Sequence, residues 1–212
     1  MILDPTLTAA YVVLATALAV SPGPDVMFVV ANGMQHKARG AVAAALGIGA
    51  GSLVHAIAAA VGVSALIAAS PQAFRVLQLA GAAYLAWLGF QALRAFFSNS
   101  SGAMLKTGVT GVSARQVFMR GLITNILNPK VIVFYLALLP QFVNVSLGHV
   151  GLQMFLLGSI HNVIGVAFLI CVGLAAGRAS GWLATTSMGR WLDAVAGVFF
   201  IGLALRLAFD RR

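Results

Sequence analysis

The sequence predicts an all-α integral membrane protein with six transmembrane helices, arranged as two inverted repeats of three helices each. Of its 212 residues, 61% are hydrophobic and 8% are charged, and the mean hydropathy is +1.00, values that exclude an ordinary soluble domain. The apolar stretches are continuous rather than alternating, which favours helices over a β-barrel. Prolines interrupt two of these stretches at corresponding places, so we expect the first and fourth helices to be broken.

Six apolar stretches are long enough to cross a bilayer. A hydrocarbon core about 30 Å thick requires roughly 20 helical residues. The stretches cover about 5–33, 40–69, 72–97, 115–140, 149–177 and 188–208. They leave no room for a soluble catalytic domain, so we expect one transmembrane domain, 1–212, with repeat 1 over about 5–97 and repeat 2 over about 115–208. The first stretch lacks the basic start and cleavage site of a secretory signal, so we expect it to be retained.

The positive charge of the chain indicates its orientation. The formal net charge is +9, but the basic residues lie mostly in short connections beside apolar stretches, a pattern typical of membrane topology rather than of nucleic-acid binding. The positive-inside rule places the odd-numbered connections in the cytoplasm and both termini outside. Three arginines near the C-terminus oppose this assignment, and a re-entrant first segment is the alternative. The basic residues of the odd-numbered connections are Lys37, Arg39, Arg94, Lys106, Arg115, Arg120, Arg178 and Arg190.

Two stretches carry the same helix-breaking device. The first contains Ser21-Pro22-Gly23-Pro24-Asp25, and the fourth contains Asn128-Pro129-Lys130. A proline removes a helical donor and clashes with the preceding turn. Three spans in each half require the second half to be inverted, and inverted repeats with discontinuous helices are typical of transporters whose site lies between the repeats near the midplane.

The breaks place ionisable groups at depth in the membrane. Half-helices that begin near Asp25 and Lys130 expose backbone N–H groups, which can hold an anion such as a carboxylate. Asp25 is the sole acid in the middle of a predicted span, where a charge costs roughly 2.5–3.5 kcal/mol. We interpret it as a proton carrier or a clamp for a substrate amine, with an N-cap as the alternative. We interpret Lys130 as a partner for Asp25 or for a carboxylate. The alternative is a lysine whose side chain extends to the membrane–water interface.

Two histidines occupy matching places in the halves, since His55 and His161 are offset by nearly the same distance as the two breaks. Gly47, Gly51 and His55 share one helix face, which predicts close packing on a neighbour. A histidine changes charge between pH 5 and 8 and suits proton coupling; the alternative is a buried ring bonded to a carbonyl. Cys171 is the only cysteine, so we expect a small buried hydrophobe.

The stretches "SPGPDVMFVVANGMQHKARG", "LQLAGAAYLAWLGFQALR" and "GLITNILNPKVIVFYLALLPQFV" resemble the lysine exporter (LysE/RhtB) family of amino-acid exporters. The resemblance runs from about residue 5 to 208. It implies a bacterial inner-membrane protein that exports amino acids or related metabolites, driven by the proton gradient. Ser52 departs from some relatives, which have an acid at this position. The residues that match the family motifs are Pro22, Gly23, Pro24, Asp25, Asn125, Asn128, Pro129 and Lys130.

We therefore expect a secondary transporter with no cofactor, whose partners are an amino acid, protons and membrane lipid, and not nucleic acid; glycine pairs are compatible with a homo-oligomer. One acid at depth favours a neutral, threonine- or homoserine-like substrate. The chief alternative is a metal-cation exporter that uses Asp25, His55 and His161 as ligands; an enzyme and a structural subunit are further alternatives. The residues expected to bind substrate or protons are Pro22, Gly23, Pro24, Asp25, His55, Asn125, Asn128, Pro129, Lys130 and His161.

Overall fold

The computed structural model describes residues 2–21, 23–63 and 112–178, with scattered positions between 65 and 94 and between 198 and 205. These residues form helices, and no strand occurs among them. The α-helices are α1 (Pro5–Val20), α2 (Pro24–Ala58), α5 (Ala114–Ile126), α6 (Pro129–Val133) and α7 (Val150–Arg178). Shorter turns are the π-helical η1 (Ala59–Val63) and η2 (Phe134–Leu138) and the 3₁₀-helical η3 (Leu139–Phe142) and η4 (Val145–Leu147).

The helices fit a membrane protein. Pro24–Gly62 and Val150–Arg178 are each long and apolar enough to cross a bilayer, and Ala114–Ile126 with Pro129–Phe142, bent by 51°, can be read as one further, broken span. The all-helical, apolar character that the sequence predicted is thus confirmed. The full set of six spans stays a prediction, because most of 72–97 and 188–208 lies outside the described residues.

The first predicted break is present, and a second turn follows it. α1 ends at Val20, and α2 begins at Pro24 with Gly23 as its N-cap. α2 then changes direction at Lys37, whose φ of 56° and ψ of −148° are not helical. The sequence predicted a connection between 33 and 40; the structure reduces it to this kink, so the second half of the first predicted span and the second predicted span as far as Ala58 form one element.

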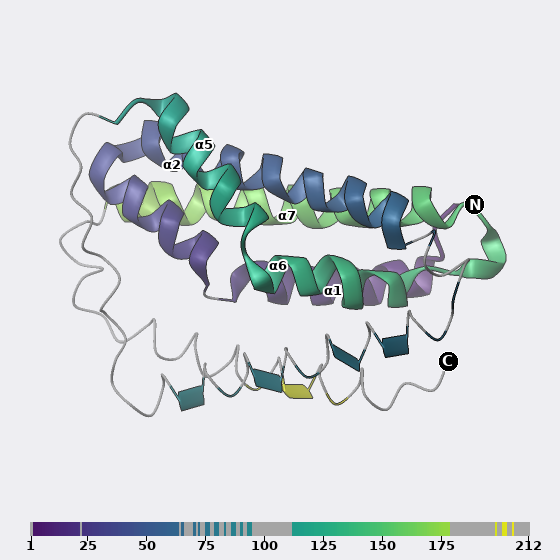
Figure 1. Cartoon of the computed structure of the whole chain (residues 1–212). Coiled ribbons are helices and arrows are strands. Elements are labelled where there is room, and N and C mark those ends of the chain that lie inside the picture. Colours follow the sequence, from purple (N-terminus) through teal and green to yellow (C-terminus); the bar gives the residue numbers. More distant parts are fainter. Residues whose placement is uncertain are drawn as a thin grey trace.

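The two broken elements run antiparallel to each other (Figure 1). The start of α1 lies beside the end of the other element, where Asn144 Nδ2 donates to Asp4 Oδ2 at 3.0 Å. Tyr11 packs edge-on against Phe142, with ring centroids 5.4 Å apart. The end of α1 lies beside the start of α6, so the two breaks meet near the centre of the helices.

Glycines allow α2 to approach both of its neighbours. A Cβ at Gly47 would lie 2.1 Å from the backbone oxygen of Phe118 in α5, and one at Gly33 would lie 2.3 Å from that of Gly173 in α7. A Cβ at Gly51 would lie 2.8 Å from the side chain of Asn125. The predicted close packing of the α2 face that contains Gly47 and Gly51 is therefore confirmed. This face packs against α5 of the same chain.

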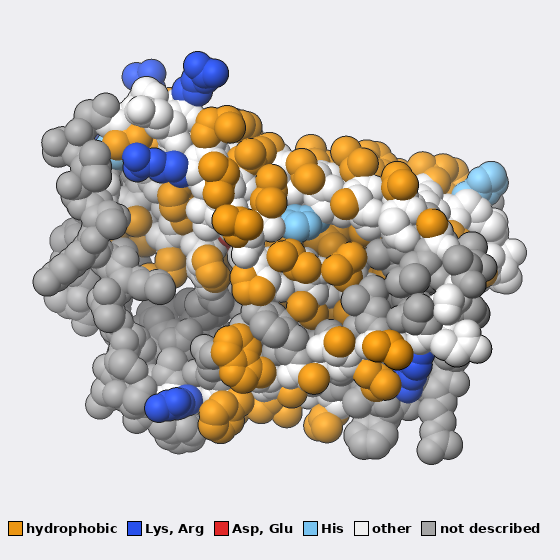
Figure 2. Space-filling model, viewed as in Figure 1, with side chains coloured by type: hydrophobic (Ala, Val, Ile, Leu, Met, Phe, Trp, Pro, Cys, Tyr) orange, Lys and Arg blue, Asp and Glu red, His pale blue; other side chains and the backbone are white. Residues whose placement is uncertain are grey.

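The outer surface is largely apolar. Figure 2 shows hydrophobic side chains along the length of the visible face, with a group of basic side chains at the end where α2 kinks and α5 begins. Cys171 is exposed on α7, so the prediction that it is buried is wrong.

Candidate functional site

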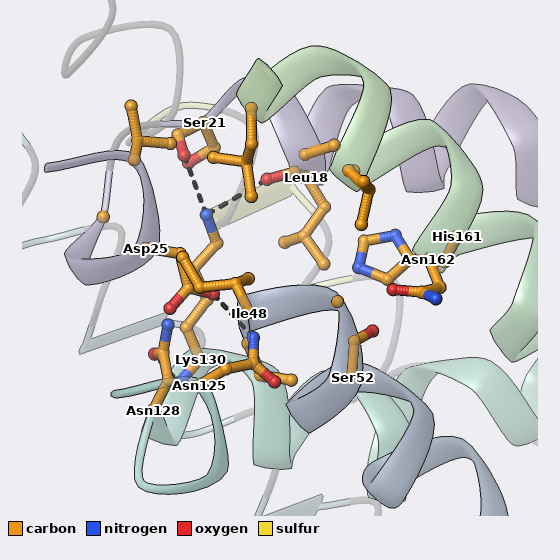
Figure 3. A pocket seen from close by; sticks show the side chains of 18 residues that line it. Leu18, Ser21, Asp25, Ile48, Ser52, Asn125, Asn128, Lys130, His161 and Asn162 are labelled. Carbon is orange, nitrogen blue, oxygen red and sulfur yellow. Dashed lines mark hydrogen bonds between the residues drawn. The ribbon is translucent and has the colours of Figure 1, made fainter. Parts of the chain in front are cut away.

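A cavity of about 60 Å³ lies where the two breaks meet (Figure 3). Helices α1, α2, α5, α6 and α7 all contribute to its walls. The polar side chains that line it are Ser21, Asp25, Ser52, Asn125, Asn128, Lys130, His161 and Asn162. Apolar side chains that line it include Leu18, Val26, Ile48, Val131, Val166 and Leu169.

The structure brings together most of the predicted site residues. Gly23, Asp25, Asn125, Asn128, Lys130 and His161 line the cavity. Pro24 and Pro129 are exposed at the starts of α2 and α6, where they break the helices without lining the cavity. His55 does not line the cavity but contacts the carbonyl of Asn125 and the ring of Tyr135, and Pro22 lies outside the described residues.

Lys130 supplies hydrogen bonds that the first break removes. In a continuous helix the carbonyl of Leu18 would accept the N–H of residue 22, but residue 22 is a proline and has none. Lys130 Nζ instead donates to the carbonyl oxygens of Leu18 at 3.0 Å and Ser21 at 2.9 Å. The C-terminal end of a helix favours a cation through its dipole. Lys130 therefore holds the end of α1, and the interpretation of a lysine extended to the interface is wrong.

The second break repeats this arrangement. The carbonyl of Asn125 would accept the N–H of residue 129, which is again a proline. It accepts the backbone N–H of Asn128 at 3.0 Å, and His55 Nε2 lies 3.3 Å from it. His55 thus donates to this carbonyl in the tautomer with a proton on Nε2. This contact matches the alternative interpretation of His55, a ring bonded to a carbonyl. Each proline leaves a carbonyl that a basic side chain from another helix can reach.

Asp25 joins the two breaks. It lies in the first turn of α2, whose N-cap Gly23 offers no side chain, so the interpretation of Asp25 as the cap is wrong. Asn125 Nδ2 donates to Asp25 Oδ2 at 2.8 Å, and the Asn128 side chain lies beside the same carboxylate (Figure 3). Asn128 is itself the N-cap of α6, where its Oδ1 accepts the backbone N–H of Lys130 at 3.1 Å.

The opposite wall comes from α7 and the middle of α2. His161 is 9% exposed and Ser52 is 5% exposed. Ser52 Oγ lies 2.8 Å from the Tyr135 hydroxyl, which also donates to the carbonyl of Gly158 at 3.2 Å. The residues expected to bind substrate or protons did not include Ser52 and Asn162, which line the cavity, or Tyr135, which contacts Ser52. The available signal was their polarity within otherwise apolar stretches, since a buried polar group in a membrane requires a partner.

The arrangement suits a small zwitterion. Asp25 can accept hydrogen bonds from an ammonium group, and the uncapped N–H groups at the start of α2 can hold a carboxylate. The cavity, at about 60 Å³, has room for a few water molecules and is much smaller than the roughly 150 Å³ that accommodates benzene. Within the described ranges, no group of three or more His, Cys, Asp or Glu side chains could hold a metal ion.

Comparison with known proteins identifies relatives along almost the whole chain. A family model described as LysE type translocator matches residues 16–211. The leucine efflux protein of Salmonella typhimurium is 30% identical over 199 residues, which cover 93% of this chain and 92% of that protein. The homoserine/homoserine lactone efflux protein of Salmonella typhimurium is 33% identical over 203 residues, with 95% and 96% covered. No solved structure matches the chain.

Proposed function

The chain belongs to the LysE type translocator family, and from this premise we propose that it exports a neutral amino acid across the bacterial inner membrane in exchange for protons. The family consists of integral membrane transporters, and relatives over more than nine tenths of the chain are efflux proteins for leucine and for homoserine. The neutral substrate, the proton coupling and the inner membrane are the parts that we propose.

The main support for this proposal is Asp25. It is the one acidic side chain among the described residues that line the cavity. A substrate with a cationic side chain requires a second counter-charge beside the one that holds its α-ammonium group. With a single carboxylate at the site, a neutral amino acid is the better match.

The exchange follows from competition for this carboxylate. When the α-ammonium group of the substrate leaves Asp25, the buried carboxylate loses one counter-charge and keeps Lys130 as its cationic neighbour, and this loss favours uptake of a proton. The site then turns back to the cytoplasmic side with Asp25 protonated and therefore neutral. Asp25 releases the proton there when the next ammonium group arrives. The antiparallel pairs α1–α6 and α2–α5 open the cavity to one side or the other.

The test is transport by the purified protein in proteoliposomes with an imposed pH gradient and a panel of labelled amino acids. We expect Asp25→Asn to abolish gradient-driven efflux. Because the proposal places both the ammonium group and the proton on Asp25, we expect exchange between equal pools to fail in this variant as well; retained exchange would leave the proton, but not the amine, on Asp25.

The matched control is Asp4→Asn. Asp4 is the N-cap of α1, at the far end of this helix from the cavity, and asparagine caps a helix about as well as aspartate. We expect this variant to transport normally. Parental efflux by Asp25→Asn, with the same dependence on external pH, would contradict the proposal.

A further inference from the structure

A second cavity, of about 260 Å³, lies between the first half of α2 and α5. It is adjacent to the first cavity along both helices. Pro24 and Thr124 line the second cavity, whereas their neighbours in the chain, Asp25 and Asn125, line the first. The second cavity also has more room than the first, which is about 60 Å³. A solute in the second cavity is therefore beside the site where the two breaks meet.

The ionisable groups of the second cavity are basic. Among the described residues that line it, Arg120 and His36 are ionisable and none is acidic. The cavity lies toward the end of the molecule where α2 kinks and α5 begins, and Figure 2 shows a group of basic side chains at this end. The first cavity, by contrast, contains the carboxylate of Asp25. A planar guanidinium group binds a carboxylate through two parallel hydrogen bonds, so the second cavity suits the acidic end of an amino acid.

Arg120 and Asp25 form two successive sites. Arg120 precedes Asn125, the partner of Asp25, by five residues on α5, which corresponds to about 7.5 Å along the helix axis. Helical side chains lean toward the N-terminus of their helix, so the side chain of Arg120 leans away from Asn125. The α-carboxylate and α-ammonium groups of an amino acid are attached to the same carbon atom. An amino acid that moves from the second cavity to the first therefore exchanges Arg120 for Asp25 as its charged partner.

Resting on the proposed export function, we propose that the second cavity is the cytoplasmic entrance, where Arg120 binds the α-carboxylate of the substrate before the ammonium group reaches Asp25. The basic residues at this end favour the cytoplasmic side of the membrane. The opposite end of α1 is packed, because Tyr11, Leu139 and Phe142 belong to one buried hydrophobic cluster there. The described helices therefore favour approach to the first cavity from the basic end.

The first test measures the apparent KM on the cytoplasmic face of proteoliposomes, with the labelled amino acid of the panel that is exported fastest. We expect Arg120→Gln to raise this KM about 3- to 10-fold and to leave the maximal rate within about twofold, because a binding contact outside the first cavity is lost. Arg120→Lys keeps the charge, so we expect a smaller increase. The matched control is Arg115→Gln, because Arg115 is exposed on the same helix and lines neither cavity. We expect the control to keep the parental KM.

The second test measures binding without transport. Ala31 lines the second cavity, so Ala31→Cys in a Cys171→Ser background reports occupancy through its rate of labelling by a water-soluble thiol reagent. We expect leucine and 4-methylpentanoate, which keeps the carboxylate and lacks the amine, to slow this labelling. Leucinamide keeps the ammonium group and lacks the carboxylate, and we expect its protection to be at least about threefold weaker. Adding Arg120→Gln should remove this difference, and adding Asp25→Asn should leave it.

The outcomes separate the entrance site from the proposed function. A parental KM in Arg120→Gln, an equal rise in KM in Arg115→Gln, or equal protection by leucinamide overturns the role of Arg120 while export stands. A rise in KM that occurs in vesicles with phosphatidylglycerol but not in phosphatidylcholine alone assigns Arg120 to a lipid headgroup and also overturns the proposal. Failure of the parent to move any amino acid overturns the export function, and carboxylate-dependent protection of Ala31→Cys then still supports the binding site. If Arg120→Gln does not fold, Arg120→Lys and the comparison of leucine with leucinamide still decide.

Discussion

Lys130→Met removes the donor that holds the end of α1, and its effect can be worked out from the structure. The ammonium group makes two hydrogen bonds of 3.0 and 2.9 Å to the carbonyls of Leu18 and Ser21. In water-soluble proteins such charge-assisted bonds contribute about 1.5–3 kcal/mol each, but side-chain hydrogen bonds measured in membranes average about 0.6 and reach about 1.7 kcal/mol. Two bonds at membrane values give a loss of about 1–3 kcal/mol in the free energy of unfolding.

Unfolding of the purified protein in detergent or bicelles measures this loss. Lys37→Met is the matched control, because Lys37 Nζ donates to a single carbonyl, that of Gly177, at 3.1 Å, and its side chain is exposed. We expect the control to lose less than about 1 kcal/mol.

A double variant tests whether the lost stability comes from the unpaired carbonyl of Leu18. Pro22→Ala restores an N–H group four residues after Leu18, and this group can bond the Leu18 carbonyl where the helix extends through Ser21, whose ψ of 128° is not helical in the parent. We expect Pro22→Ala in the Lys130→Met background to recover part of the lost stability. Unchanged stability in Lys130→Met would refute the role assigned to Lys130.

Two further predictions concern packing and orientation. Gly33→Ala puts a Cβ 2.3 Å from the backbone oxygen of Gly173, so we expect a loss of about 1–3 kcal/mol in unfolding free energy; Gly62→Ala, with no described atom within 4 Å, is the control and should change stability little. Ser113 and Ser146 are exposed near opposite ends of the α5–α6 element, so we expect cysteines there to be labelled by a membrane-impermeant thiol reagent from opposite sides, with Ser113 cytoplasmic; labelling of both from outside would contradict this topology.

Local chemistry made part of the site predictable. A proline has no N–H wherever it stands, so the breaks before α2 and α6 followed from the sequence, and with them the shared cavity of Asp25 and Lys130. The identity of the groups that repair the breaks did not follow. Lys130 and Leu18 are 112 residues apart, and such a pairing depends on how the two broken elements cross.

Two of the three interpretations that the structure contradicts, those of Asp25 and Cys171, have separate physical causes. Asp25 was a reasonable N-cap by residue type, but the chain places Gly23 at that position with a fully extended backbone, φ 179° and ψ −178°, and the carboxylate turns to Asn125 instead. Cys171 was expected inside because it lies in an apolar run. In a membrane helix the lipid-facing side is as apolar as the packed side, so hydropathy does not distinguish them.

The missing N–H of Pro22 also sets an order for biosynthesis. The ribosome makes α1 first, and the residue that completes its last turn is made 112 positions later. Until then the carbonyl of Leu18 lacks the N–H of residue 22, and it either accepts a hydrogen bond from water in the cavity that Leu18 lines or stays unpaired. We therefore expect the end of the first broken helix to be completed only when α6 has been made.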